Sequence, residues 1–513
     1  MDKIDFEILH RQFASVAEDM GRALQRSAFS PNIKERCDFS CAVFAANGEM
    51  LAQAEHIPVH LGSMPASVRA AIESGPLRPG DAVLLNDPYR GGTHLPDLTL
   101  VMPVFAGGRV RWYVANRAHH ADVGGMAPGS MPLSTELFQE GMRLPPVRLF
   151  RAGRLQEDVL ELFLANVRTR GEREGDLRAQ VAANRLGAAR LRELLGRWGP
   201  RRLAEYEKAL ARLCESSMRR VIRAIPRGTW RFEDALDGDG VDPGPLPVRV
   251  RIQARGDRVE IDFAGTARES RGCVNAPAPV TLSAVFYVFR CLAEERLPMN
   301  RWSMKPIRIA LPEGSIVNPR FPAAVCGGNV ETSQRVVDAL FGALAKALPG
   351  RIPAASCGSM NNVVIGGREF SYYETIGGGA GGGPEGAGAD GIQVHMTNTR
   401  NTPVEALEHA YPLEIVRYAI RRGTGGRGRH RGGDGIVRAY RVLQDVRVSL
   451  LTERRDRGPW GLCGGGPGAR GRNLRVRGGR VEVLPAKANL ELRKGDVLVI
   501  ETPGGGGWGK PVS

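Results

Sequence analysis

The chain lacks the long apolar runs of a membrane protein. Within its 513 residues, no stretch approaches the roughly 18 consecutive apolar residues that a spanning helix needs. The first residues, Met1 to Asp5, do not have the charged-then-apolar pattern of a leader peptide. The charged fraction of 25% and the hydrophobic fraction of 42% are typical of a folded protein. We therefore expect a cytoplasmic protein that does not bind membranes.

Paired cysteines and aromatic residues are also scarce. The eight cysteines are scattered, and only Cys37 and Cys41 lie close together, without a second pair at zinc-finger spacing. Buried free thiols are therefore favoured over a structural zinc.

The net charge of +16 could suit nucleic acid, but it is spread along the chain, and aromatics make up only 6%. With no recognisable nucleic-acid-binding motif, we expect no nucleic-acid partner.

Several catalytic and phosphate-binding motifs are missing or incomplete. The chain has no G-x-S-x-G nucleophile elbow and no H-E-x-x-H zinc helix. Residues 504–510 match G-x-x-x-x-G-K, but Pro511 replaces the required Ser or Thr. Residues 423–428 match G-x-G-x-x-G, but residues 413–422 before them look helical, whereas a dinucleotide site needs a strand there. An ATP site is therefore not predicted within this chain.

Hydrophobic patterning divides the chain into regions of different character. Residues 5–28 are predicted to be helical, Asn47-Gly48 indicates a hairpin, and residues 228–265 alternate as strands do. We predict an α+β (mixed α/β) multidomain protein with mixed or antiparallel sheets and a separate helical segment. The predicted regions are an N-terminal α/β part carrying the metal site (1–150), a helical part broken at Gly171 and Gly199-Pro200 (151–226), a mixed α/β part (227–355) and a glycine-rich, β-containing part (356–513).

Glycine is abundant, with 65 residues concentrated in the last third of the chain. Clusters occur at 377–391, 423–435, 464–471 and 504–509, between strongly patterned segments. Flexible linkers are one interpretation. We favour ordered turns in which backbone approaches backbone or ligand, because only glycine permits that approach.

The stretch from Asn86 to Gly125 holds three of the nine histidines, with aspartates among them. Predicted strands at 98–105 and 110–115 form a hairpin about Gly107-Gly108, so its two open ends bring these side chains together. The candidate metal ligands are His94, Asp97, His119 and His120, and Asp122 is a candidate partner for an imidazole N–H.

Three neutral imidazoles, or two with a carboxylate, suit a divalent metal such as Zn, Mn or Fe(II). The alternative is that these are loop histidines satisfied by hydrogen bonds. His56 and His60 could face the same site or serve a structural role.

Longer motifs run through nearly the whole chain. They include Glu35-Arg36-x-Asp38-Phe39-Ser40, residues 53–64, both halves of the His/Asp stretch, Pro128-Gly129-Ser130, residues 171–180, Asp262-Phe263-x-Gly265-Thr266, residues 327–335, His395-Met396-Thr397-Asn398-Thr399, Gly433-Asp434-Gly435 and residues 501–507. In these motifs the chain resembles the hydantoinase B/5-oxoprolinase family. That family includes subunits of 5-oxoprolinases, hydantoinases, and acetone and acetophenone carboxylases.

The resemblance implies a division of labour between two subunits. A partner A-type subunit would bind ATP and phosphorylate the carbonyl oxygen of the substrate, and the B-type subunit would complete the conversion. In the carboxylase relatives the corresponding chain holds a metal through a His-x-x-Asp pair and a later His. The matching positions here are His94 and Asp97, with His119 and His120 both open as the third ligand.

We therefore expect the B subunit of an ATP-dependent cyclic-amide hydrolase of the hydantoinase, N-methylhydantoinase or 5-oxoprolinase type. A metal-bound water would open the activated ring, with His94, Asp97, His119, His120 and Asp122 as catalytic residues. Its partners would be an A-type ATPase in a hetero-oligomer and a small cyclic amide. One alternative is a subunit of an ATP-dependent ketone carboxylase of the acetone or acetophenone type. Another is a non-catalytic scaffold for the ATPase.

Overall fold

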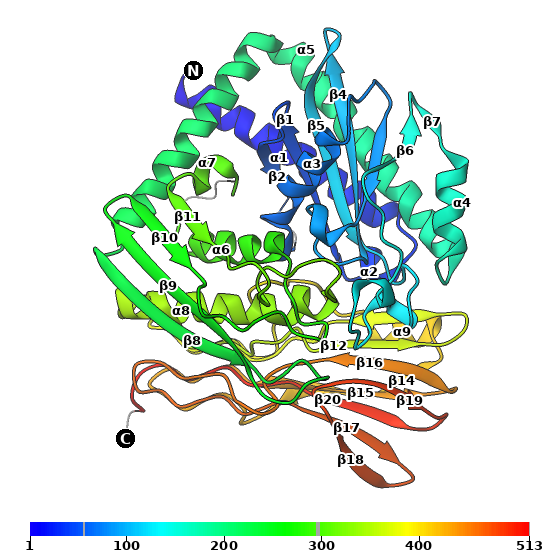
Figure 1. Ribbon diagram of the computed structural model, residues 1–513, viewed down its shortest axis with the longest axis vertical. Helices are drawn as coiled ribbons and strands as arrows, with labels where there is room; N and C mark the ends of the chain where they lie inside the picture. Colours follow the sequence, from blue (N-terminus) through cyan, green and yellow to red (C-terminus); the bar gives the residue numbers. More distant parts are fainter. Residues whose placement is uncertain (55–56, 294–297, 512–513) are drawn as a thin grey trace.

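The computed structural model describes residues 1–54, 57–293 and 298–511. It contains four sheets, with helices packed on and between them (Figure 1). Within the described part of the chain, strand pairing is antiparallel except between the neighbours β10 and β11. The predicted α+β class with mixed or antiparallel sheets is therefore confirmed.

A seven-stranded sheet, ordered β2-β1-β5-β4-β3-β6-β7, carries the residues of interest. Its strands are β1 (Phe39–Ala45), β2 (Met50–Gln53), β3 (Ala82–Leu85), β4 (Asp97–Ala106), β5 (Arg109–His119), β6 (Val147–Arg151) and β7 (Arg154–Leu155). Every residue of β1 is buried because both faces of the sheet are covered. Val43 packs on one face of the sheet, in a core formed with residues of two long helices. Its neighbour Phe44 packs on the opposite face, in a core formed with residues of a third helix.

The two long helices are α1 (Lys3–Ser27) and α5 (Arg170–Arg223), and the third is α3 (Ser63–Glu73). α1 buries Leu9, Phe13 and Val16 at helical spacing. α5 is interrupted at Gly199, whose φ of +70° lies outside the helical region, and Pro200 follows. The short helices α2 (Pro31–Lys34) and α4 (Glu157–Ala165) complete this part. In the described ranges, no helix is both long and apolar enough to cross a membrane.

The middle of the chain forms a four-stranded sheet packed against helices. The order is β11-β10-β9-β8, from β8 (Gly228–Leu236), β9 (Leu246–Arg255), β10 (Arg258–Asp262) and β11 (Ile307–Ala310). Helix α8 (Ser333–Ala347) packs on β8 and β9, and it is buried on nearly all sides because α6 (Ala278–Leu292) covers it as well. The short helix α7 is Arg301–Met304. Directly before α8 lies a π-helix, η5 (Gly328–Thr332).

Two sheets stack in the C-terminal part. One is ordered β13-β12-β16-β19 and the other β14-β15-β20-β17-β18, with their inner faces sharing one apolar core. The elements are β12 (Asn362–Gly366), β13 (Ser371–Glu374), α9 (Val404–Ala410), β14 (Leu413–Arg421), β15 (Gly435–Val442), β16 (Val446–Leu451), β17 (Arg472–Arg477), β18 (Arg480–Leu484), β19 (Lys487–Leu492) and β20 (Val497–Glu501).

The helix expected at residues 413–422 was wrong. This segment is strand β14, which pairs along its length with β15 and buries Leu413 in the shared core. Ladder pairing and burial outweigh a local helical periodicity in such a case. The G-x-G-x-x-G segment therefore does follow a strand, but it leads into another strand, β15, so a helix N-terminus for a dinucleotide is still missing.

The glycine clusters pack against one another, as predicted from their contexts. The amide of Gly505 donates to the carbonyl of Gly433 at 2.9 Å, and the amide of Gly433 donates to that of Ala380 at 2.8 Å. A Cβ atom added to Gly433 would lie 1.9 Å from the carbonyl oxygen of Ala389. Backbone meets backbone here without room for side chains, which explains why several glycine clusters distant in sequence occur together.

Candidate metal centre

The candidate centre lies where the β4–β5 hairpin opens. Asp97 begins β4, His119 ends β5, and the two residues are direct partners in the antiparallel ladder. His94 lies one turn before the strand, and its carbonyl oxygen accepts a hydrogen bond from the amide of Asp97 at 3.2 Å. The hairpin thus brings together side chains that are 22 or more residues apart in sequence, as its spacing predicted.

Two imidazoles converge on one oxygen of the Asp97 carboxylate, which makes three potential ligands. His94 Nε2 lies 3.2 Å from Asp97 Oδ1, and His119 Nδ1 lies 3.3 Å from the same atom. One ligand atom from each of the three residues falls within 4.8 Å of the others, and all three side chains are buried. Two imidazoles with a carboxylate are a donor set that Zn, Mn and Fe(II) accept.

Three of the four nitrogens of His94 and His119 lack a hydrogen bond from the described residues. Among the described residues, neither ring nitrogen of His94 has a hydrogen-bond partner, and His119 Nε2 has none. Buried polar atoms are nearly always paired, so such a concentration of unpaired nitrogens calls for an explanation. A metal ion held by His94, Asp97 and His119 fits the residues present, because each offers a ligand atom close to the others and the His94 nitrogens have no hydrogen bond to give up.

A fourth polar group, His60 from the short helix η1 (Pro58–His60), holds the other oxygen of the carboxylate. His60 Nε2 lies 3.3 Å from Asp97 Oδ2, and its Nδ1 lies 2.8 Å from Ser40 Oγ. The Thr93 hydroxyl also donates to Oδ2. Asp97 is therefore oriented from one side by His60 and Thr93, which leaves Oδ1 facing the two candidate ligand imidazoles.

Burial and charge set the protonation of the centre. Burial alone would raise the pKa of Asp97, but nearby His94 and hydrogen bonds from His119 and His60 hold that pKa well below its usual range. Burial lowers the pKa of His119 and of His60, against the opposing effect of Asp97. An ionised carboxylate among neutral imidazoles is the state in which these groups bind metals.

A small cavity adjoins this centre. Its volume is about 20 Å³, room for roughly one water molecule. Tyr373 lines it and stacks on His119, with ring centroids 4.4 Å apart and planes 17° apart. Asp38 also lines it, and burial raises the pKa of its carboxyl, chiefly opposed by His119. The centre therefore has an enclosed space with an ionisable group beside it.

His120 faces away from this group. Its Nε2 lies 2.9 Å from Gln180 Oε1 on α5, and its ring meets Phe163 edge-on. Burial lowers the pKa of His120 to about 4. Adjacent residues at the end of a strand point to opposite faces of the sheet, so only one of the two neighbouring histidines reaches the centre.

Asp122 is engaged in holding a loop. Its carboxylate accepts hydrogen bonds from the amides of Gly124, Gly129 and Arg168 at 2.9 to 3.0 Å, and from the Arg168 guanidinium at 2.9 Å. None of these contacts, all within the described residues, is with an imidazole of the centre. The structure thus places it as an anchor between the segment after β5 and the start of α5.

Two side chains of the centre had no role assigned from the sequence. Asp38 belongs to the motif that starts at Glu35. Its backbone carbonyl accepts a hydrogen bond from the His119 amide at 3.0 Å, a contact between strands that the sequence pattern does not indicate. Tyr373 comes from β13, more than 250 residues further along the chain. His60 was one of two candidates near this site, and the other, His56, lies outside the described residues.

Comparison with known proteins agrees with the motifs. A family model described as hydantoinase B/oxoprolinase matches residues 2–511. An uncharacterized protein of Methanocaldococcus jannaschii is 42% identical over all of this chain and 91% of its own length. A 5-oxoprolinase of Arabidopsis thaliana is 38% identical, again over all of this chain. The chain spans only 42% of that oxoprolinase.

Solved structures show the same architecture. The ATP-dependent caprolactamase from Pseudomonas jessenii superimposes with a TM-score of 0.92 at 25% identity, covering 99% of this chain and 91% of that one. Acetone carboxylase in a nucleotide-free structure superimposes with a TM-score of 0.91 at 19% identity, covering 99% of this chain and 76% of that one. The second likeness, at that identity, concerns the fold alone.

Proposed function

Since this chain belongs to the hydantoinase B/oxoprolinase family, we propose that it is the B-type subunit of an ATP-dependent cyclic-amide hydrolase. A partner A-type subunit would use ATP to phosphorylate the carbonyl oxygen of the amide, and this chain would open the activated ring. The observation that carries the proposal is the convergence of His94, Asp97 and His119 with unpaired nitrogens beside an enclosed cavity.

A divalent metal bound by these three residues would supply Lewis acidity and would lower the pKa of a nearby water toward neutrality. The protein's own groups have distinct tasks around it. His60 and Thr93 hold Oδ2 of Asp97, so that Oδ1 keeps its direction. The buried surroundings of the centre exclude bulk water, which strengthens the electrostatic interactions among its side chains.

Asp38 is the proton-exchanging group that we assign beside the cavity. Ring opening needs a proton delivered to the departing nitrogen, and a carboxyl with a raised pKa can carry one at a pH where ordinary carboxyls are ionised. The buried guanidinium of Arg36 lies 3.8 Å from Asp38 Oδ2, which keeps the carboxyl in place.

The test compares metal content and ring opening in the wild type and in three single variants. His94→Ala and His119→Ala should each lose the metal and the ATP-dependent opening of hydantoins or 5-oxoproline in the presence of the A-type partner. His120→Ala should keep the metal, because His120 bonds to Gln180 instead. Full activity of metal-free His94→Ala protein would sink the proposal.

Ketone carboxylation is the second candidate, because the family that the motifs resemble also includes subunits of acetone and acetophenone carboxylases. The same centre would then stabilise an enolate. Bicarbonate-dependent consumption of a ketone and ATP, with no opening of cyclic amides, would select it. Activity that survives the combined loss of His94, Asp97 and His119 would instead point to a scaffold for the ATPase.

A further inference from the structure

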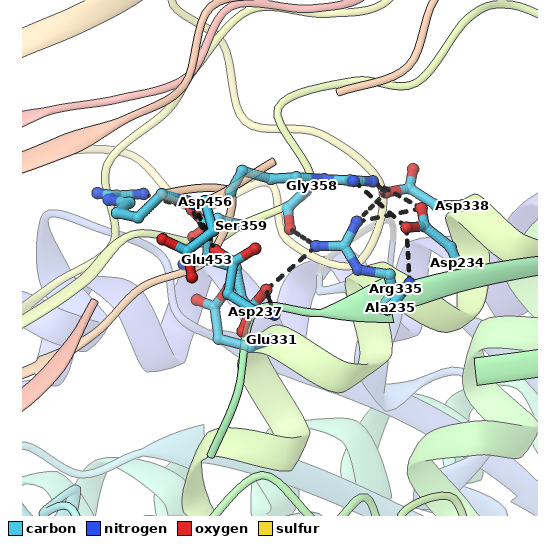
Figure 2. Close-up of polar contacts among 12 residues, drawn as sticks. Asp234, Ala235, Asp237, Glu331, Arg335, Asp338, Gly358, Ser359, Glu453 and Asp456 are labelled. Atoms are coloured by element: carbon cyan, nitrogen blue, oxygen red, sulfur yellow. Dashed lines mark hydrogen bonds and ion pairs between the residues drawn. The ribbon is translucent and has the colours of Figure 1, made fainter. Parts of the chain in front are cut away.

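The π-helix η5 joins the candidate centre to a second buried group of polar residues. Asn329 and Val330 of this helix line the cavity beside His119. The next residue, Glu331, places its carboxyl near Glu453 and Asp237 (Figure 2). A π-helix is a rare element that recurs at functional sites. One helical turn therefore contacts the cavity with two residues and the charged interior with the third.

Glu331 holds two neighbours in place through one oxygen. Its Oε1 accepts a hydrogen bond from the amide of Met360 at 3.1 Å and another from Nδ2 of Asn362 at 2.8 Å. The same Nδ2 also donates to the carbonyl of Leu451 at 3.0 Å. Because Nδ2 has an acceptor for each of its two hydrogens, the orientation of the Asn362 amide is determined.

This orientation determines the direction of the next hydrogen bond. The oxygen of Asn362 lies 2.8 Å from the hydroxyl of Tyr373, so the hydroxyl must donate to it. The phenol oxygen then keeps its lone pairs for a further hydrogen bond. The Tyr373 ring is also clamped, with His119 stacked at 4.4 Å and the guanidinium of Arg36 lying 4.8 Å from the ring centroid.

The surroundings of Glu331 favour its neutral form. Burial and then the negative charge of Glu453 raise the pKa of Glu331 to about 8, against the nearby cations Lys487 and Arg455. Asp237 and Arg335 are the other charged side chains facing this group (Figure 2). A hydrogen bond from Ser359 also lowers the pKa of Glu331, but burial and the charge of Glu453 outweigh it.

Resting on the function proposed above, we propose that Glu331 is a positioning residue that acts through Asn362 to aim the phenol of Tyr373 in the cavity wall. With its own hydrogen donated to Asn362, the phenol oxygen accepts a hydrogen bond from a donor in the cavity. The cavity has room for about one water molecule, so water is the donor that the phenol oxygen holds there.

The experiment uses the full chain after chelation and reloading with Co²⁺, whose visible spectrum reports ligand geometry. Wild type, Glu331→Gln and Tyr373→Phe are compared from pH 6.5 to 9.5, with Tyr113→Phe as the matched control, since Tyr113 is a buried tyrosine of β5 outside this chain of contacts. In wild type we expect one bound Co²⁺ and a spectral change centred near pH 8.

Glu331→Gln should bind the same Co²⁺ and resemble wild type at pH 7, because a carboxamide mimics the neutral carboxyl, but its spectral change near pH 8 should be absent. Tyr373→Phe should also bind Co²⁺, and with the A-type partner its kcat for ring opening should fall about tenfold with KM little changed, because the phenol positions a water and not the substrate. Tyr113→Phe should match wild type throughout.

The two proposals fail in different ways. A wild-type chain that takes up no Co²⁺ would overturn the metal centre and, with it, the relay that acts on that centre. Normal uptake with the same pH-dependent spectrum in Glu331→Gln, or an unchanged kcat in Tyr373→Phe, would overturn the relay and leave the metal centre standing.

Discussion

Two fully buried polar regions of this protein differ in how they satisfy their charges. In the first, the candidate metal centre, the His94 nitrogens have no hydrogen-bond partner among the described residues, although Nε2 lies 3.2 Å from Asp97 Oδ1. The second, which we call the Arg335 cluster, consists of Arg335, Arg454, Lys487, Asp234, Asp338 and Glu453. It has three cations and three carboxylates, each ending on an opposite charge. Figure 2 shows Arg335 with the three carboxylates.

The difference indicates what each region is for. In the Arg335 cluster, Asp338 Oδ2 lies 3.0 Å from Arg335 and 2.7 Å from Arg454, so the ion pairs are complete within the protein. Burial would raise the pKa of Asp234, but Arg335 and Arg454 outweigh it and lower the pKa. Buried charges that end on opposite charges serve structure, whereas two imidazoles around one carboxylate, with three ring nitrogens lacking a hydrogen bond, suit a metal ion.

The largest expected effect separates the two regions by activity. His94→Ala should reduce ring opening by at least about a thousandfold, since the metal's chemistry is lost. The unfolding free energy of the metal-free protein should change less than activity, because the variant loses the contact of His94 Nε2 with Asp97 Oδ1 but no larger network of ion pairs. Coupled assays with the A-type partner and urea unfolding measure the two quantities. The exposed His409→Ala serves as control and should change neither.

The converse change belongs to the Arg335 cluster. Asp338→Ala should lower the free energy of unfolding by about 3–5 kcal/mol, because Arg335 and Arg454 are left as buried charges short of a partner. The protein that remains folded should still bind one metal ion. Glu313→Ala, which breaks only the exposed pair with Arg320, should cost less than about 1 kcal/mol in the same urea titration. Equal losses in the two variants would contradict the contrast.

The adjacent histidines sharpen the comparison through pH. His120 has a folded-state pKa of about 4, below its value in the unfolded chain, so its contribution to stability is complete above about pH 6.5 and is lost as the pH falls toward 4. Wild type should therefore lose roughly 3 kcal/mol across that window relative to His120→Gln, which cannot take up the proton. Parallel stability curves for the two proteins would show that His120 is not buried as described.

The smallest expected effect comes from the glycine packing, which involves backbone contacts and not the charged side chains of the two polar regions. Gly433→Ala should lower the free energy of unfolding by about 1–3 kcal/mol, because its Cβ would meet the Ala389 backbone and neither chain can yield easily. Gly386→Ala, where nothing lies within 4 Å of the added atom, should be close to neutral or slightly stabilising. Thermal unfolding of both variants decides between ordered packing and a loose linker.

Local pattern was enough to predict the hairpin and the centre it carries. Alternating strands about Gly107-Gly108 require Asp97 and the residues near 119 to meet, whatever the rest of the fold does. The choice between His119 and His120 as the residue facing His94 could not be made from spacing, because it depends on which face of the sheet α5 covers. That follows from contacts such as His120 with Gln180, 60 positions further along the chain.

The remaining parts depend on contacts between distant segments. Tyr373 reaches His119 from a strand of a different sheet, and its orientation depends on Asn362 and Glu331. The mistaken helix at residues 413–422 has a similar origin, because pairing with β15 decided its conformation. In both cases the deciding partner lies outside any window in which periodicity can be read.

The β4–β5 hairpin also allows the two strands between the candidate ligands and the turn to differ in length without moving the ligands. The candidate ligands lie at its open end, and the turn at Gly107-Gly108, where an added Cβ meets nothing within 4 Å, lies at the other. One residue added to each strand next to the turn preserves the pairing of Asp97 with His119. The hairpin can therefore lengthen, shorten or carry an inserted peptide at its tip while the chemistry at its base keeps the same geometry.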